Sequence, residues 1–178
     1  IAETCGACKY INQKYQDILA IKFDNLMAPY SDLPLLQSTQ IMRAAESPQI
    51  LGYQTHSLLT VRPVQWADKN SSPLPASDVH ENSEPAPQRF ALGVPQPNRD
   101  LLIDLRDCPI QKDSINRLVS DLGPMLDRSE LTPFDPKSND GDIAAIEIRA
   151  AHLTNELMLT FVVKNDRKRL LKTFLHNL

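Results

Sequence analysis

The stretch that decides the fold is "IAAIEIRAAHLTNELMLTFVV", residues 143–163. Its first part, 143–150, sets Ile146 and Ile148 between Glu147 and Arg149. Its second part, 156–164, repeats the alternation with Leu157, Leu159, Phe161 and Val163. A period of two is typical of a β-strand with one buried face. The two parts predict an antiparallel hairpin.

Helical spacing appears on both sides of this hairpin and near the start of the chain. Apolar residues recur at i, i+3 and i+4 in residues 12–28, 113–126 and 167–178. For 113–126 we expect Asp113 or Ser114 to cap the start and Pro124 to bend or end the helix early. A short helix around 35–45 is a further prediction, closed by Pro48.

Three more strands are predicted before the central helix. They are 50–62, 88–94 and 100–105, the first two separated by a Pro-rich stretch at 63–87 that we interpret as a long exposed loop. Parallel pairing needs crossovers of about a dozen residues or more, and only the 113–126 region offers one cleanly. The order of elements therefore predicts an α+β fold with a mostly antiparallel sheet and helices packed on it.

Composition narrows the class of protein. The 178 residues carry a net charge of −3 and are 42% hydrophobic, values of an ordinary globular protein, so any nucleic-acid binding must use a local patch. No apolar run approaches the ~20 residues of a membrane span. Three cysteines are too few for a secreted disulfide scaffold, which favours the cytoplasm.

The ends of the sequence suggest a piece of a longer protein. The chain opens on Ile1 rather than Met, and "RKRLLKTFLHNL" stops inside an apolar helical pattern without a stop signal. We therefore expect further sequence on both sides.

Two cysteines form a C-x-x-C pair in "TCGACKY", residues 4–10, and the third, Cys108, is far away in "LRDCPIQ". Thiolates at this spacing can share zinc or an iron–sulfur cluster, since a short turn brings both to one side. The four histidines stand singly, which offers no zinc pattern. A redox pair remains open, as does the absence of any role for Cys5 and Cys8.

Three segments resemble one family in the same order. "CGACKYINQKYQDILAIKFDNL", "SPQILGYQTHSLLTV" and "LGVPQPNRDLLIDLRDCPIQ" are similar to motifs of the 5-methyluridine RNA methyltransferases. That family includes the bacterial enzymes that methylate C5 of uracil in 23S ribosomal RNA. The resemblance covers residues 5–110, and the remaining hairpin and helix fit the end of the same central domain.

The resemblance implies a ligand set for the cysteines. Cys5, Cys8 and Cys108 correspond to three of the four ligands of a [4Fe–4S] cluster, and the fourth is expected six residues before Cys5, upstream of Ile1. Such a cluster ties the N-terminal segment to the sheet by closing a long loop, a structural staple.

The resemblance also implies what lies elsewhere. The family's S-adenosylmethionine domain, cysteine nucleophile and carboxylate base have no match here, so we assign no catalytic residue, and we expect enzymatic activity only in the parent protein. The expected parts are a cluster-binding segment at 1–8, a helical segment at 9–48 and a central α+β domain at 49–178. The apolar stripe of the 12–28 helix would pack on the missing domain or pair with another copy of the chain.

Candidate RNA contacts follow from the same resemblance. Lys9, Arg89 and Arg99 are the predicted RNA-binding residues. The family's G-Y-R-x-K strand reads Gly52-Tyr53-Gln54-Thr55-His56 here and lacks its cations. A further candidate group is Lys164, Arg167, Lys168 and Arg169, which we interpret as the solvated start of a helix rather than an RNA contact. Trp66 can stack on a base, but we interpret it as a cover for the hairpin.

Two other functions compete with this one. The lost cations and the acidic balance are also consistent with a non-catalytic scaffold domain derived from the family. The C-x-x-C pair alone is consistent with a small thiol redox protein.

Overall fold

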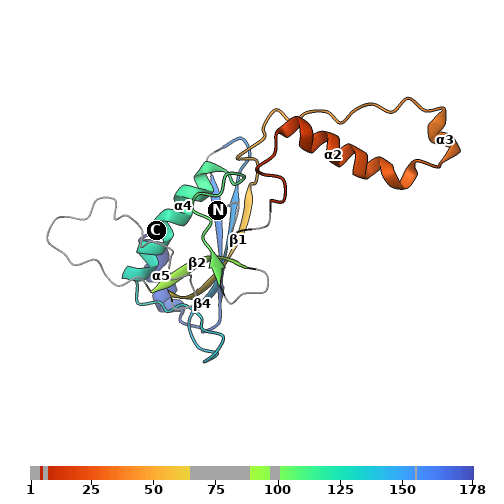
Figure 1. The fold of residues 1–178 in the computed structure, drawn as a ribbon. Helices are drawn as coiled ribbons and strands as arrows, with labels where there is room; N and C mark the ends of the chain where they lie inside the picture. Colours follow the sequence, from red (N-terminus) through yellow and green to blue (C-terminus); the bar gives the residue numbers. More distant parts are fainter. Residues whose placement is uncertain (1–4, 6–7, 65–88, 97–100, 155) are drawn as a thin grey trace. The chain divides into compact units, whose positions relative to one another are not determined.

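The computed structural model describes residues 5, 8–64, 89–96, 101–154 and 156–178 (Figure 1). Within these residues the chain divides into two compact units, an N-terminal unit, Ala2–Ile50, and a sheet unit, Leu51–Leu178. None of the described helices is long and apolar enough to cross a membrane. Trp66, and the predicted Pro-rich loop from residue 65 onward, lie outside the described residues.

Five antiparallel strands form the sheet of the sheet unit. The strands are β1 (His56–Pro63), β2 (Phe90–Pro95), β3 (Leu102–Ile103), β4 (Ile143–Ala150) and β5 (Leu157–Val163), in the spatial order β3-β2-β1-β4-β5. Leu59 lies opposite Ile146, and Ile146 lies opposite Phe161, so one apolar row crosses three strands. The predicted hairpin is β4–β5, and the predicted α+β fold with a mostly antiparallel sheet is confirmed.

Two helices pack on the same face of this sheet. Helix α4 (Asp113–Arg128) buries a stripe of apolar residues, and α5 (Lys168–His176) buries Phe174. The rings of Phe174 and Phe161 meet edge to face, with centroids 5.8 Å apart. The core consists of these side chains and the inward residues of the strands: Leu59, Val61, Phe90, Ile115, Val119, Leu122, Leu126, Ile143, Ile146 and Ile148.

Two details of α4 differ from the prediction. Lys112 is the N-cap residue, since its carbonyl accepts the first helical hydrogen bonds from Ile115 and Asn116. No side chain caps the helix, because a lysine side chain has no acceptor atom. Pro124 neither ends nor shortens the helix, which continues to Arg128. Proline costs one backbone hydrogen bond at this point, and the buried apolar residues on both sides of it hold the last turn on the sheet.

The predicted strand at 50–62 begins later than expected. Residues 52–54 bond to the loop before α4 instead of a neighbouring strand: Gly52 N–H donates to the Pro109 carbonyl at 2.9 Å, and Gln54 N–H donates to the Ile110 carbonyl at 2.8 Å. Gly52 has a φ of 65°, which a glycine adopts without strain. The segment from residue 52 therefore joins the sheet only at His56, where β1 begins.

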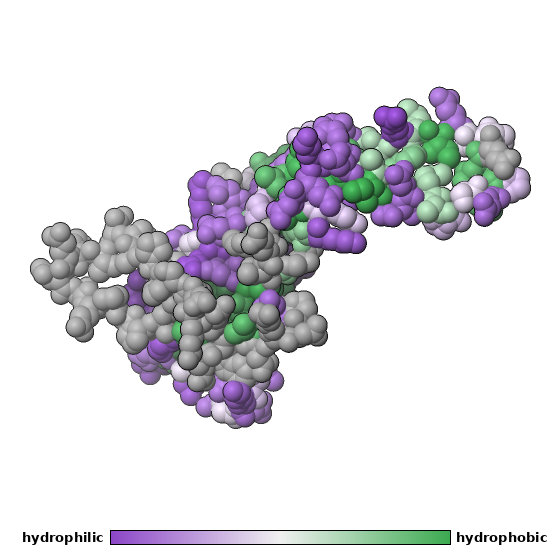
Figure 2. Space-filling view, in the orientation of Figure 1, coloured by the Kyte–Doolittle hydropathy of each residue, from purple (hydrophilic) through white to green (hydrophobic). Residues whose placement is uncertain are grey.

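The N-terminal unit contains helix α2 (Tyr15–Met27), the 3₁₀ turn η1 (Ala28–Tyr30) and the short helix α3 (Pro34–Gln37). The predicted helix at 35–45 stops after one turn, since the hydroxyls of Ser38 and Thr39 both donate to the Leu35 carbonyl. Such bonds compete with helical hydrogen bonds. Helix α2 has no buried residue, and Figure 2 shows hydrophobic residues at the surface along this unit.

Candidate nucleic-acid interface

The three cysteines belong to different units. Cys5 and Cys8 lie in the N-terminal unit and are half-buried, and Cys108 is buried in the turn between β3 and α4 of the sheet unit. None of these three described cysteines forms a disulfide. The turn around Cys108 is fixed by its backbone: Cys108 N–H donates to the Leu105 carbonyl at 3.1 Å, and the Asn116 side-chain amide donates to the Cys108 carbonyl at 2.9 Å.

The donor chemistry of these cysteines suits iron–sulfur ligation, since clusters are held by thiolates. Three thiols are one fewer than a [4Fe–4S] cluster takes. Among the described residues, no group of three His, Cys, Asp or Glu side chains is arranged to hold a metal ion. The buried amide oxygens of Gln111 and Asn116 add no ligand, because oxygen is not the donor that a cluster selects. The ligand set stays a prediction.

The three predicted RNA-binding cations have different surroundings. Lys9 is exposed in the N-terminal unit, with its ammonium 5.3 Å from the centre of the Tyr10 ring. Arg99 lies outside the described residues. Arg89 is half-buried beside the end of α4, where its guanidinium donates to the carbonyls of Leu126, Asp127, Ser129 and Leu131.

The guanidinium of Arg89 satisfies carbonyls that the end of a helix leaves without partners. A cation at this end also stabilises the helix, because it lies beside the negative pole of the helix dipole. Asp127 completes the arrangement, since its Oδ1 accepts the N–H groups of Arg89 at 2.7 Å and Phe90 at 2.9 Å. The structure thus gives Arg89 an internal bonding role, and its predicted contact with RNA stays untested.

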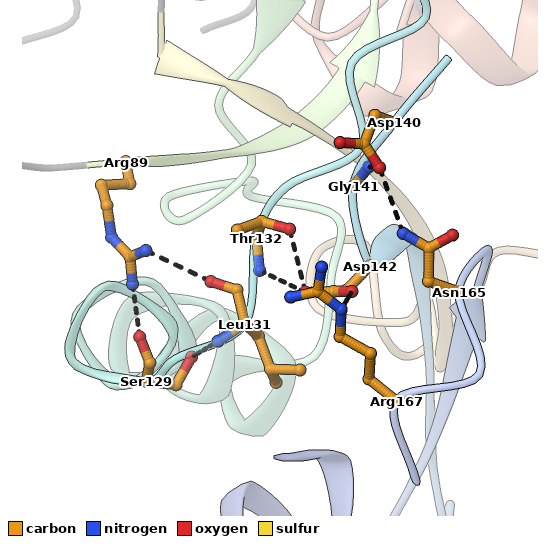
Figure 3. A network of polar contacts seen from close by, with 9 residues as sticks. All are labelled: Arg89, Ser129, Leu131, Thr132, Asp140, Gly141, Asp142, Asn165 and Arg167. Carbon is orange, nitrogen blue, oxygen red and sulfur yellow. Dashed lines mark hydrogen bonds and ion pairs between the residues drawn. The ribbon is translucent and has the colours of Figure 1, made fainter. Parts of the chain in front are cut away.

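A second polar network holds the start of α5 (Figure 3). Asp142 is buried, and its Oδ2 accepts the N–H and the hydroxyl of Thr132, both at 2.9 Å. Its Oδ1 accepts no hydrogen bond from the described residues but faces Arg167 Nε at 3.2 Å, an ion pair. Asn165 donates to Asp140 Oδ1 at 3.3 Å. The segment before α5 is therefore fixed to the loop before β4.

Cations on α5 differ from those elsewhere in the sheet unit. Lys168, Arg169 and Lys172 are exposed, and only Lys168 has an ion-pair partner among the described residues, Asp166 at 3.2 Å. Lys168 and Asp166 are both largely exposed, so this pair neutralises little. The outward face of α5 is thus a local excess of positive charge.

The opposite face of the sheet, turned away from α4 and α5, carries a mixed surface. Leu58, Met158 and Val162 are exposed there. Beside them, Glu147 Oε1 bonds to His56 Nε2 and Arg149 Nε, each at 2.8 Å. The hydrogen bond from Arg149 is the main cause that lowers the pKa of the Glu147 carboxyl. A carboxylate in the middle of this group makes it a poor phosphate site.

Known proteins resemble the chain over nearly its whole length, although no protein-family profile matches it. An uncharacterized RNA methyltransferase of Chlorobaculum tepidum is 23% identical over 170 residues, 95% of this chain and 34% of that protein. A 23S rRNA (uracil(747)-C(5))-methyltransferase of Glaesserella parasuis is 24% identical over 168 residues, 93% of this chain and 36% of that protein.

A solved structure shares the fold. The crystal structure of the Pyrococcus abyssi tRNA (uracil-54, C5)-methyltransferase, in complex with S-adenosyl-L-homocysteine, matches with a TM-score of 0.61 and 15% identity. The match covers 96% of this chain and 34% of that one. The predicted resemblance to uracil-C5 RNA methyltransferases is confirmed. The chain spans about a third of the length of the relatives it matches.

Two features that organise the polar residues of the chain could not be predicted from the sequence. Nothing in the pattern "NDGDIAAI" sets the buried Asp142 apart from its exposed neighbours. The role of Arg89 was equally hidden, since its partners are backbone carbonyls some 40 residues further on. One signal was present for α5: residues 164–176 contain five Lys or Arg and one Asp.

Proposed function

We propose that this chain is the central, RNA-binding part of an S-adenosylmethionine-dependent RNA uracil-C5 methyltransferase, with ribosomal RNA as the substrate class. The observation that carries the proposal is the similarity, over more than nine-tenths of the chain, to proteins named for methyl transfer to RNA, two of them for uracil C5. We place the reaction in the cytoplasm, as the cysteine count favours.

In the proposed reaction, the methyl group passes from the sulfur of S-adenosylmethionine to C5 of a uracil. The C5 proton leaves, and S-adenosylhomocysteine remains. The crystal structure of the Pyrococcus abyssi enzyme contains this product. No residue of this chain is assigned to the chemical step. Its contribution is to bind and orient RNA for catalytic groups located elsewhere in the complete protein.

We further propose that Cys5, Cys8 and Cys108 bind a [4Fe–4S] cluster, with a fourth ligand from outside the 178 residues. The thiol chemistry of the three cysteines and the C-x-x-C spacing of Cys5 and Cys8 support this. When bound, the cluster would supply a cross-link between the start of the N-terminal unit and the turn that precedes α4. A cross-link over about 100 residues removes a large conformational entropy from the unfolded chain.

The test of the function is methyl transfer by the complete natural protein that carries this chain. RNA labelled with tritium at uracil C5 is incubated with S-adenosylmethionine carrying a ¹⁴C methyl group. We expect one tritium to be released for each methyl group incorporated, and 5-methyluridine to appear in the digested RNA. Incorporation without tritium release would place the methyl group on another atom, and no incorporation would remove the enzymatic proposal.

The test of the cluster is the content of iron and acid-labile sulfide in the complete protein, prepared without oxygen. We expect about four irons and four sulfides per chain, lost in a Cys108→Ser variant. As a matched control, Ser57→Ala also alters a small buried polar side chain of the sheet unit, whose hydroxyl oxygen accepts a hydrogen bond from the Gln111 side chain. It should keep the iron. Equal iron in both variants would exclude Cys108 as a ligand.

A further inference from the structure

Positive charge is concentrated at the end of the chain. Residues 164–176 hold five of the 19 Lys and Arg of the chain but only one of its 22 Asp and Glu. The remainder of the chain is therefore strongly acidic, although the whole carries only −3. Such asymmetry points to a surface with an anionic partner.

Helix α5 separates this charge from its apolar residues. Phe174 is buried and Leu170 and Leu171 are half-buried, so this side packs on the sheet. Lys168, Arg169 and Lys172 lie on the exposed side, where i, i+3 and i, i+4 spacing makes them neighbours. With a rise of 1.5 Å per residue, the exposed side from Lys168 to His176 is about 12 Å long.

The charge of α5 is unfavourable for the helix itself. The first turn contains no acidic residue, although it contains Lys168 and Arg169. Cations there are repelled by the positive pole of the helix dipole, and Lys168 and Lys172 repel each other at i, i+4 spacing. Bound anions would relieve both effects.

Most other cations of the sheet unit already have partners. Lys112 donates to the carbonyls of Ala151 and His152, and Arg89 donates to carbonyls at the end of α4. Arg106 and Arg149 form ion pairs with Asp104 and Glu147, whose side chains are 34% and 23% exposed. By contrast, no ion pair joins Arg169 or Lys172 to any residue that the structure describes.

We propose that the outward face of α5, formed by Lys168, Arg169 and Lys172, binds the phosphate backbone of the RNA substrate. This deepens the proposed function and rests on it. The face supplies three cations, and among the described residues the only carboxylate that forms an ion pair with it is Asp166. Phosphate contacts of this kind position a protein on RNA without reading its sequence.

The start of α5 is built to hold this face in one orientation. Arg167, which precedes the helix, is paired with the buried Asp142, and Lys164 N–H donates to the Asp142 carbonyl at 2.8 Å. The Lys164 ammonium lies 5.0 Å from the centre of the Phe134 ring. Lys164 and Arg167 thus make contacts within the protein. The three outward cations, Lys168, Arg169 and Lys172, remain accessible to a ligand.

A membrane surface is the competing anionic partner. A cationic amphipathic helix binds lipid by inserting its apolar face. In α5 the centre of that face is used inside the protein, since Phe174 packs on Phe161 and Leu170 and Leu171 are half-buried. Only Leu175 and, after the helix, Leu178 are exposed there, which is a small apolar surface for insertion into lipid. The exposed charge therefore favours RNA.

The test measures the binding of a fluorescein-labelled single-stranded RNA of roughly 20 nucleotides to the 178-residue chain by fluorescence anisotropy. The KCl concentration is varied from about 0.05 to about 0.3 M, the range in which counterion release governs the affinity. The variant is Lys168→Gln/Arg169→Gln/Lys172→Gln. The matched control, Arg117→Gln/Arg128→Gln/Arg149→Gln, removes the same charge from other surfaces of the sheet unit. Circular dichroism confirms that both are folded.

Loss of three phosphate contacts should make the negative slope of log K against log salt shallower by about 2. For each tenfold rise in salt, the wild-type affinity should therefore fall about a hundredfold more than the affinity of the variant. The control should keep most of the slope. Equal slopes in the two triple variants would overturn the proposal, as would wild-type chain that fails to bind RNA. Stronger α5-dependent binding to vesicles of phosphatidylserine and phosphatidylcholine than to RNA would also overturn it.

This result is separable from the test of the proposed function. If the complete protein methylates RNA but the α5 variant keeps its salt slope, the interface is wrong and the enzymatic proposal stands. If the α5 variant loses RNA binding but the complete protein transfers no methyl group, the interface stands and the enzymatic proposal is wrong.

Discussion

The two units of the chain are stabilised in different ways. The sheet unit buries a continuous set of apolar side chains between five strands and two helices. In the N-terminal unit, no described residue is buried, and Leu26, Tyr30, Leu33, Leu35 and Met42 are exposed. The sheet unit can thus be held together by the hydrophobic effect, and the N-terminal unit cannot be held by its own side chains alone.

This difference gives the proposed cluster a physical purpose. Segments of about 40 residues or fewer usually need a metal, a disulfide or a partner to be stable, because they bury too little surface. The N-terminal unit is close to that size and contains two of the three cysteines. Its exposed apolar residues also offer a surface for another domain or another copy of the chain, which stays a prediction.

The largest expected effect separates the two units directly. Ile146→Ala removes a fully buried side chain from the middle of the sheet and should lower the free energy of unfolding by about 2–5 kcal/mol. Leu26→Ala, at a residue that is 62% exposed on α2, should change it by less than about 0.5 kcal/mol. Urea unfolding followed by circular dichroism measures both. If Ile146→Ala fails to fold, Ile146→Val should still cost about 0.5–1.5 kcal/mol. Equal losses at the two sites would contradict the comparison.

A smaller effect tests whether polar contacts within the sheet unit also stabilise it. Arg89→Ala removes charge-assisted hydrogen bonds to the carbonyls of the last turn of α4, and we expect a loss of about 1.5–3 kcal/mol. The control is Arg117→Ala, at an arginine whose side chain is 77% exposed and paired with Asp113 on the helix surface. It should cost less than about 0.5 kcal/mol. A loss at Arg89 no larger than at Arg117 would show that the carbonyls bond equally well to water.

The smallest effect concerns pH. Burial is the main cause that raises the pKa of the Asp127 carboxyl above its ordinary 3.8, and the N–H groups of Arg89 and Phe90 partly oppose it. The folded protein then binds this proton more tightly than the unfolded chain, so stability is lost as pH rises from 3.8 through the raised pKa.

Asp127→Asn should remove that loss, because the amide oxygen still accepts hydrogen bonds but carries no charge. The variant should gain stability relative to wild type as pH rises through this window and then keep a constant difference. The difference in the free energy of unfolding is measured by urea unfolding from about pH 3.5 to about pH 7, a range that includes the titration of carboxyl groups. Asp127→Ala should instead cost about 1–3 kcal/mol at pH 7, since it leaves buried N–H groups unsatisfied. Parallel pH curves for wild type and Asp127→Asn would contradict the assignment.

Local pattern was sufficient where one residue type and its spacing decide the structure. The alternation around Ile146 predicted β4 and β5, and apolar spacing predicted α2, α4 and α5 within a few residues. It was insufficient where distant groups compete for the backbone. Pro124 stays inside α4 because the helix is packed on the sheet, and residues 52–54 leave the predicted strand because Pro109 and Ile110 bind them.

The sequence by itself determined the α+β class, the antiparallel hairpin and the resemblance to uracil-C5 RNA methyltransferases, since all three depend on the order and spacing of residues. Only the tertiary structure decided which charges are available to a ligand. Arg89 and Arg167 look like other surface cations in the sequence, but the first binds backbone carbonyls and the second binds the buried Asp142. Arg169 and Lys172 differ from them because α5 turns its apolar side to the sheet, which leaves their charges in water.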